Sequence, residues 1–239
     1  MPDHAEDFQA EVLFAYTILS ALRPDWPGSL ILSCGLGPQG SAVALAAHIA
    51  GAAILAIDER PDICRAAMRS GACDFAVNSV DEALRALKNE IRQRRPLGVA
   101  LELSPNLALT ELLDRGVVPQ LFTTLASEPN ALDPAIRDRA VNTLRPLGTQ
   151  FVGFFSVKTI PAESLPTSPA RSENHLQMHT FRFSTAAELH AFDVIALAEL
   201  PWQPDRRNWL LSAGRLFPRD RHRVLWLKEH EYRQLTSSK

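Results

Sequence analysis

The sequence predicts an α/β protein built on a doubly wound parallel sheet, with an N-terminal helix and a C-terminal α/β extension. Short apolar runs alternate with stretches of helical length from residue 30 to residue 157, which is typical of consecutive βαβ units. The first run leads into a G-x-G-x-x-G motif at Gly35, Gly37 and Gly40, and the second run closes on Asp58. These observations together predict a Rossmann-like sheet.

Each expected element is predicted from the spacing of its apolar residues and from the Pro, Gly or polar residues that mark its ends. The expected strands cover residues 30–33, 53–57, 75–77, 99–103, 117–122 and 151–157. The expected helices cover residues 5–22, 41–50, 61–70, a long stretch opening at Ser79, 107–115 and 134–144.

A Pro- and Ser-rich stretch at residues 161–173 reads as an exposed loop and divides the chain. We expect residues 1–158 to form the Rossmann-like domain with its N-terminal helix. Residues 159–239 would be a linker and an extension that packs on the sheet or extends it. In that extension we expect strands at 179–183 and 224–227, helices at 186–191 and 209–216, and an apolar run at 194–197.

The glycine motif predicts a dinucleotide site. Gly35 would allow a tight turn, Gly37 a close approach of backbone to a pyrophosphate, and Gly40 close packing of helix on sheet. The following helix would offer free N–H groups and a partial positive charge to phosphates. The expected cofactor-binding residues are those of this loop and of neighbouring strand ends: Gly35, Leu36, Gly37, Gln39, Gly40, Ser41, Asp58, Ser104 and Thr123.

Asp58 suggests which cofactor is bound. It follows the second strand, where a carboxylate can accept both ribose hydroxyls of NAD and would repel the 2′-phosphate of NADP. We therefore expect NAD+ to be preferred over NADP. Arg60 complicates this expectation, because a nearby arginine can serve an NADP phosphate.

Composition narrows the class of protein. The net charge of −2 does not favour a nucleic-acid or membrane partner. The three scattered cysteines read as thiols of a reducing compartment. No apolar run reaches membrane-spanning length, and the acidic start is unlike a signal peptide. We expect a cytoplasmic homo-oligomer with a dinucleotide and a possible small-molecule ligand as its partners.

Between Trp26 and about Val118 the chain resembles the NAD-binding domain of urocanase, urocanate hydratase. The similarity is carried by GSLILSCGLGPQGSAVALAAHIAGA, by the region around Asp58 with Pro61, and by the segments GACDF, DEAL and RGVVP. The resemblance implies a tightly bound NAD+ that acts as an electrophile toward the substrate imidazole. It also implies that Gly35, Gly37, Gly40, Ser41 and Asp58 contact this cofactor.

The chain departs from that family where its catalytic residues are expected. Residues 124–129 stand where the family carries a DQTS-x-H sequence, and only Ser127 matches. The catalytic Tyr and Cys segments of the family have no counterpart that we recognise. The first hypothesis is therefore a urocanase-like, NAD-binding regulatory or binding module without a complete hydratase site.

Two further hypotheses remain open. The chain could be a lyase or oxidoreductase whose C-terminal part or partner completes a site over NAD, with His179, His190 and Asp193 as candidate groups. It could also be an interaction protein that has lost the cofactor. Whether it is an enzyme is left undecided, and no catalytic residue is assigned.

Other residues favour structural interpretations. His175 and His179 are four apart, but no third ligand accompanies them, so no metal site is expected. Cys34 could be activated by the nearby helix start, although a small residue closing a strand is the simpler interpretation. The basic cluster around Arg219 to Arg223 is more simply explained by docking on the acidic N-terminal helix, or on a neighbouring subunit, than by nucleic-acid binding.

Overall fold

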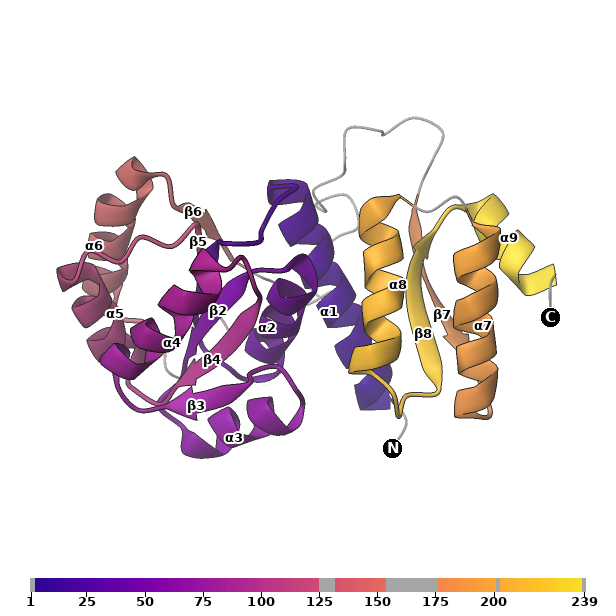
Figure 1. Cartoon of the computed structure of the whole chain (residues 1–239), viewed down its shortest axis with the longest axis horizontal. Coiled ribbons are helices and arrows are strands. Elements are labelled where there is room, and N and C mark those ends of the chain that lie inside the picture. Colours follow the sequence, from indigo (N-terminus) through magenta and orange to yellow (C-terminus); the bar gives the residue numbers. More distant parts are fainter. Residues whose placement is uncertain (1–2, 125–131, 154–175, 201–202, 238–239) are drawn as a thin grey trace. The chain divides into compact units, whose positions relative to one another are not determined.

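The computed structural model describes residues 3–124, 132–153, 176–200 and 203–237. It divides into two compact units. One spans Arg23–Thr159, and the other combines Met1–Leu22 with Ile160–Lys239. Figure 1 shows each unit as strands flanked by helices.

The Arg23–Thr159 unit has a six-stranded, entirely parallel sheet in the order β3-β4-β2-β1-β5-β6. Its strands are β1 (Leu30–Cys34), β2 (Ala53–Ile57), β3 (Phe75–Val77), β4 (Leu97–Leu101), β5 (Leu121–Thr124) and β6 (Gln150–Val152). Its helices are α2 (Pro38–Ala50), α3 (Pro61–Arg69), α4 (Val80–Arg92), α5 (Pro105–Asp114) and α6 (Pro134–Leu144), followed by the 3₁₀ turn η1 (Arg145–Leu147). This is the predicted doubly wound, Rossmann-like fold.

The strand order makes β1 the centre of the sheet. The chain runs from β1 to β2 on one side and later returns to place β5 on the other side. The gap between β1 and β5 is therefore the topological switch point, where open α/β sheets bind ligands beyond the carboxyl ends of the strands.

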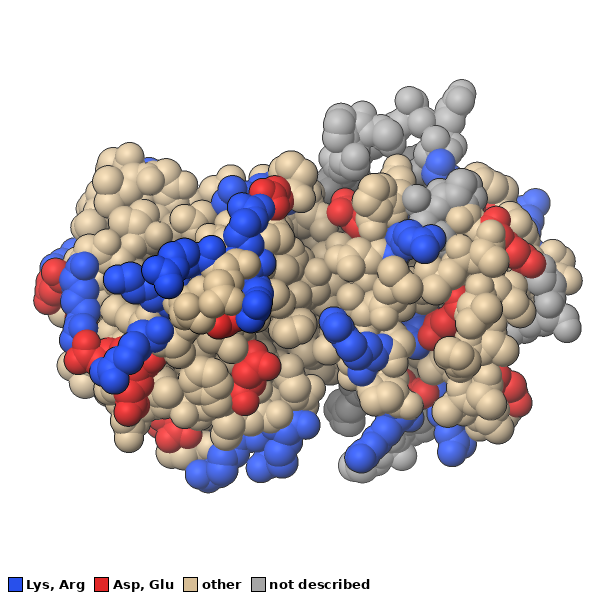
Figure 2. Space-filling model, viewed as in Figure 1, with Lys and Arg blue, Asp and Glu red and all other residues tan. Residues whose placement is uncertain are grey.

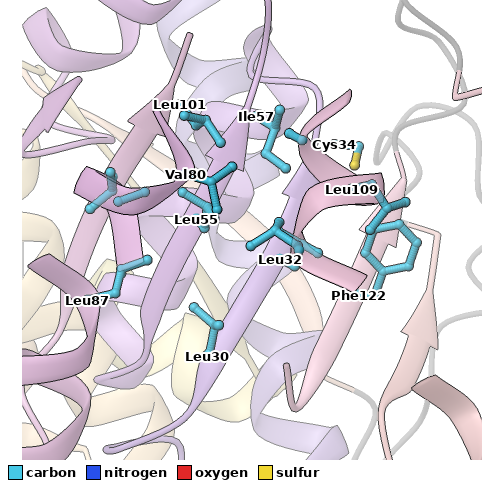
Figure 3. Packing of buried hydrophobic residues seen from close by; sticks show 14 of the residues in the cluster. Leu30, Leu32, Cys34, Leu55, Ile57, Val80, Leu87, Leu101, Leu109 and Phe122 are labelled. Atoms are coloured by element: carbon cyan, nitrogen blue, oxygen red, sulfur yellow. The ribbon is translucent and has the colours of Figure 1, made fainter. Parts of the chain in front are cut away.

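Alternate side chains of the central strands enter a core shared with α4, α5 and α6. Figure 3 shows this packing around Leu32, Leu55 and Phe122, with Val80 from α4 and Leu109 from α5. Residues between these in the strands point to the opposite face of the sheet. Helix α2 contacts β1 and β2 there, and nine of its residues are buried because its side chains are mostly small.

The second unit consists of α1 (Asp3–Leu22), β7 (Gln177–Arg182), α7 (Ala186–Glu199), α8 (Pro204–Leu216), β8 (His222–Leu227) and α9 (Glu229–Ser237). Strands β7 and β8 form a separate antiparallel pair. Helix α1 is held on β8 by hydrogen bonds. Gln9 Oε1 accepts from the backbone N of Val224 at 2.8 Å, and Trp226 Nε1 donates to Thr17 Oγ1 at 3.0 Å.

This grouping corrects one expectation about domain organisation and narrows another. The N-terminal helix belongs to the unit that contains the C-terminal strands, because its buried face and Gln9 bind β8. Of the two alternatives for the C-terminal extension, packing on the parallel sheet or extending it, the second is excluded, because β7 and β8 pair with each other in a separate sheet. The expected boundary near residue 158 lies outside the described residues.

Several element boundaries also differ. Helix α7 continues to Glu199 and includes the apolar run 194–197, and α9 follows β8 as an additional helix. Strand β5 begins at Leu121, later than expected. Among the described residues, no helix is both long and apolar enough to cross a lipid bilayer.

Candidate functional site

The glycine motif lies where β1 leaves the centre of the sheet. Gly35 has a φ of 102°, a left-handed conformation that favours glycine, and its N–H donates to the carbonyl of Ile57 at 2.8 Å. Gly37 is the N-cap of α2 in an extended conformation, and the Ser41 N–H donates to its carbonyl at 2.8 Å. The chain therefore turns tightly from the central strand into a helix at the switch point.

The start of α2 suits an anion. Pro38 occupies the first turn, where its missing N–H is not needed by the helix, and Gly37 has no side chain to cap the helix. The first turn carries no acidic residue. Because helix N-termini carry unsatisfied N–H groups and a partial positive charge, this end would attract a phosphate.

Asp58 directly follows β2 and ties the glycine loop to the neighbouring strand. Its Oδ2 accepts from the backbone N of Leu36 at 3.0 Å and from Arg60 Nη2 at 2.7 Å. Its Oδ1 accepts from Arg60 Nε at 2.8 Å and from the Arg60 backbone N at 3.0 Å. The side chain is 1% exposed, against 29% for Arg60.

Burial alone would raise the pKa of the Asp58 carboxyl. The hydrogen bonds and charge of Arg60, with the hydrogen bond from Leu36, outweigh burial and hold the pKa below its usual range. Asp58 is therefore an anion at neutral pH, and it already accepts four hydrogen bonds from the protein.

Thr123 brings an unsatisfied hydroxyl to the switch point. It lies in β5 directly opposite Ser33 of β1, close to the carboxyl ends of both strands. Thr123 is fully buried, and its Oγ1 has no hydrogen-bond partner in the protein. Because a buried hydroxyl without a partner costs about 1–3 kcal/mol, this atom suits a polar group of a ligand.

The remaining predicted residues fall into two groups. Leu36 is buried in the loop, Gln39 is half-buried in the first turn of α2, and the buried Ser41 donates its hydroxyl to the Leu36 carbonyl at 3.1 Å. Ser104 is instead the N-cap of α5 after β4, which is separated from β1 by β2. The structure thus brings the loop residues, Asp58 and Thr123 to neighbouring strand ends, with Ser104 farther along the edge.

Two polar features escaped the sequence analysis. Ser33 is a buried polar residue in an otherwise apolar strand, and its hydroxyl lies 3.5 Å from the Gly35 carbonyl. This single polar residue in an apolar run was the available signal. The paired geometry of Asp58 and Arg60 could have been suspected from their separation by one residue.

The structure places Cys34 on the core side of the sheet, where it packs with the α4–α6 residues. Burial raises its pKa to about 12, so it is a thiol at neutral pH, and the helix start does not activate it. His179 stacks on Tyr232 at 4.2 Å between ring centroids, while His175 lies outside the described residues. Within the described part of the chain, no cluster of three metal-ligating side chains occurs.

Two basic residues of the C-terminal unit pair with acids of that same unit. Arg223 Nε and Nη2 donate to Asp193 Oδ1 and Oδ2 at 2.9 and 2.7 Å. Arg206 Nη2 donates to Glu231 Oε2 at 2.7 Å. Figure 2 shows basic and acidic side chains interspersed over the visible face.

The fold and the glycine loop define a Rossmann-like domain. A model of the urocanase Rossmann-like domain matches residues 12–135 of the chain. The chain therefore belongs to the urocanase family through this domain, as its resemblance to urocanase indicated.

Three solved structures are similar to parts of the chain. A short chain alcohol dehydrogenase from E. coli CFT073, complexed with NADH, is 15% identical with a TM-score of 0.37 and covers 61% of this chain. Benzyl alcohol dehydrogenase from Acinetobacter calcoaceticus is 21% identical with a TM-score of 0.35 and covers 63%. Alcohol dehydrogenase TADH from Thermus sp. ATN1 is 17% identical with a TM-score of 0.36 and covers 91%. The chain spans 35%, 34% and 57% of their respective lengths.

Proposed function

We propose that this chain is a urocanase-like dinucleotide-binding module. The observation that carries the proposal is the meeting of the glycine loop, the start of α2 and the unsatisfied Thr123 hydroxyl at the switch point of the sheet. A dinucleotide pyrophosphate would lie over Gly37 at the N-terminus of α2. The Thr123 hydroxyl would bond a polar group of the part of the ligand that reaches β5.

A nicotinamide dinucleotide is the chemical class that we propose as the ligand. When bound, its oxidised nicotinamide ring is electrophilic and can accept a nucleophile or a hydride. The chain's own contribution would be to bind and orient the ligand through backbone N–H groups, while the adjoining strand ends exclude water. The urocanase family membership supports this class over other phosphate ligands.

The proposal is for binding without urocanate hydration. Residues 124–129 depart from the DQTS-x-H sequence of urocanases, and most of them lie outside the described residues. Of the groups considered for a C-terminal active site, Asp193 is engaged in the pair with Arg223. We propose a regulatory or partner-dependent role for the bound dinucleotide.

The test replaces Gly37 with valine, whose branched side chain would occupy the space where the pyrophosphate must approach the protein backbone. Gly37 has an extended conformation open to any residue, so the variant should fold. Calorimetric titration with NAD and NADP should show one saturable site in the parent protein and none in Gly37→Val.

Gly214→Ala is the matched control, since it also enlarges a glycine but lies in α8 of the other unit. An added Cβ there would meet Asp193 Oδ2 at an ordinary 3.5 Å. It should bind dinucleotide as the parent does. Undiminished binding by a folded Gly37→Val variant would show that the glycine loop is not the site.

A further inference from the structure

The Asp58 carboxylate, which the sequence predicts to bind a ribose, already accepts a full set of hydrogen bonds from the protein. The two oxygens of an ionised carboxylate offer about four acceptor positions. In Asp58 the Leu36 backbone N–H takes one, and Arg60 takes three through its backbone N–H, Nε and Nη2. A ribose with free 2′- and 3′-hydroxyls would therefore have to displace Arg60 before it could donate to Asp58.

The same arrangement changes the charge that a ligand meets. The Asp58 carboxylate is compensated by the Arg60 guanidinium at 2.7 Å, so it no longer opposes a second anion as an isolated acid would. The side chain of Arg60 is 29% exposed while that of Asp58 is 1% exposed, so a ligand from solvent reaches the cation first. The Nε–Nη2 edge of Arg60 is used on Asp58, so a phosphate would meet the outer end of the guanidinium and be attracted chiefly by its charge.

Arg60 is also fixed in place. Its backbone is the N-cap of α3, and its backbone N–H and side chain both bind the same carboxylate. A guanidinium held in this way loses less conformational entropy on binding an anion than a free surface arginine. It lies beside the loop that would hold the pyrophosphate, since Leu36 of that loop shares the carboxylate.

We propose that Arg60 sets the cofactor preference of this site and selects a dinucleotide carrying a 2′-phosphate, that is, the NADP class. The inference rests on the proposed dinucleotide function and reverses the preference expected from Asp58 alone. Arg60 acts in two ways: it occupies the acceptors that NAD would use, and it presents a cation to the phosphate that NAD lacks.

Two neighbouring carboxylates act against this selection. Glu59 and Asp62 flank Arg60, and both are exposed to solvent. Exposed charges are screened by water and contribute little, whereas the Arg60 guanidinium is held by a buried carboxylate. The balance therefore favours the phosphate.

Calorimetric titration of the full chain with NADP, NAD, 2′,5′-ADP and 5′-AMP tests the inference. We expect NADP to bind at least about tenfold tighter than NAD, which corresponds to about 1.4 kcal/mol. The 2′,5′-ADP probe should exceed 5′-AMP by a similar factor. Inorganic phosphate should bind far more weakly than 2′,5′-ADP, and equal binding would contradict a dinucleotide selector by indicating a simple anion site.

Arg60→Gln and Arg60→Lys are the informative variants. Arg60→Gln should lose at least about tenfold in NADP affinity and keep or gain NAD affinity, because it frees acceptors on Asp58. Arg60→Lys keeps the charge but loses the two-point geometry of the guanidinium. Its NADP affinity should lie between those of the parent protein and of Arg60→Gln. Arg69→Gln removes the same charge at the last turn of α3 and should leave both affinities unchanged.

The outcomes separate this inference from the proposed function. Tight NAD binding with weaker NADP, or an NADP-to-NAD ratio unaffected by Arg60→Gln, would overturn the role of Arg60 and leave dinucleotide binding intact. Failure of the parent protein to bind any of the four probes would overturn both. Circular dichroism of each variant shows whether it is folded, so that a loss of affinity can be attributed to the binding site and not to unfolding.

Discussion

Replacing Asp58 with alanine tests how strongly the candidate site is built into the fold. The change removes the acceptor of four hydrogen bonds and leaves the buried Leu36 N–H without a partner. An unsatisfied buried N–H costs about 1–3 kcal/mol. Removing one partner of a fully buried ion pair costs about 3–5 kcal/mol. Arg60 is 29% exposed and can regain water, so the pair contributes less here. We expect a total loss of about 2–4 kcal/mol.

Urea unfolding followed by far-UV circular dichroism measures this loss. Asp62→Ala is the matched control, because Asp62 is an exposed acid in the first turn of α3. Its interaction with the helix dipole is worth only about 0.3–1 kcal/mol. A cost for Asp58→Ala no larger than that for Asp62→Ala would refute the claim that these hydrogen bonds hold the loop to β2.

The same carboxylate predicts an acid dependence. The pKa of Asp58 is lowered in the folded protein, so between that value and the unfolded value of about 3.9 the unfolded chain binds more protons. The contribution of Asp58 to stability is therefore complete above about pH 5, about one pH unit above the unfolded pKa, and is lost as the pH falls through the lowered value. The urea midpoint of Asp58→Asn should depend less on pH in this acid range than that of the parent. If the urea midpoints of Asp58→Asn and of the parent protein changed in parallel with pH, the lowered pKa assigned to Asp58 would be contradicted.

Two further predictions concern buried groups. Asp193→Ala should cost about 3–5 kcal/mol in urea unfolding, because it leaves the Arg223 guanidinium buried without its carboxylate, whereas a cost below about 1 kcal/mol would argue against the pair. Burial raises the pKa of Cys34, Cys64 and Cys73 to about 12 in each case, so Ellman's reagent at about pH 8 should react far more slowly with the native protein than with the unfolded chain, where the thiol pKa is about 8.5. Equal rates would show that the thiols are accessible.

Elements defined by local signals were predicted with accurate boundaries. Strand β2 and helix α6 have the expected bounds, because Gly51 precedes one and Pro134 opens the other. The glycine loop and Asp58 were also predictable, since short-range spacing sets their geometry. These features required no knowledge of distant contacts.

Features that depend on distant contacts were not predictable. An apolar run as short as 194–197 can be a strand or part of a helix, and here it completes a turn of α7, with Val194 and Ile195 exposed. The attachment of α1 to β8 depends on Gln9 reaching Val224, far away in the sequence. The hydrogen bonds that saturate the Asp58 carboxylate depend on the rotamer of Arg60 and on the position of the Leu36 backbone. Sequence spacing alone reveals neither of them.

Amide chemical shifts of the isotope-labelled full chain, recorded during titration with NADP and with NAD, test the central claim most directly. A dinucleotide at the switch point should shift the backbone amides of Gly35, Leu36, Gly37 and Gly40, together with Thr123. The largest shifts would then lie in the loop that joins β1 to α2. Shifts confined to β7, β8 and their helices, or no shifts at all with either dinucleotide, would contradict the assignment of this loop as the ligand site.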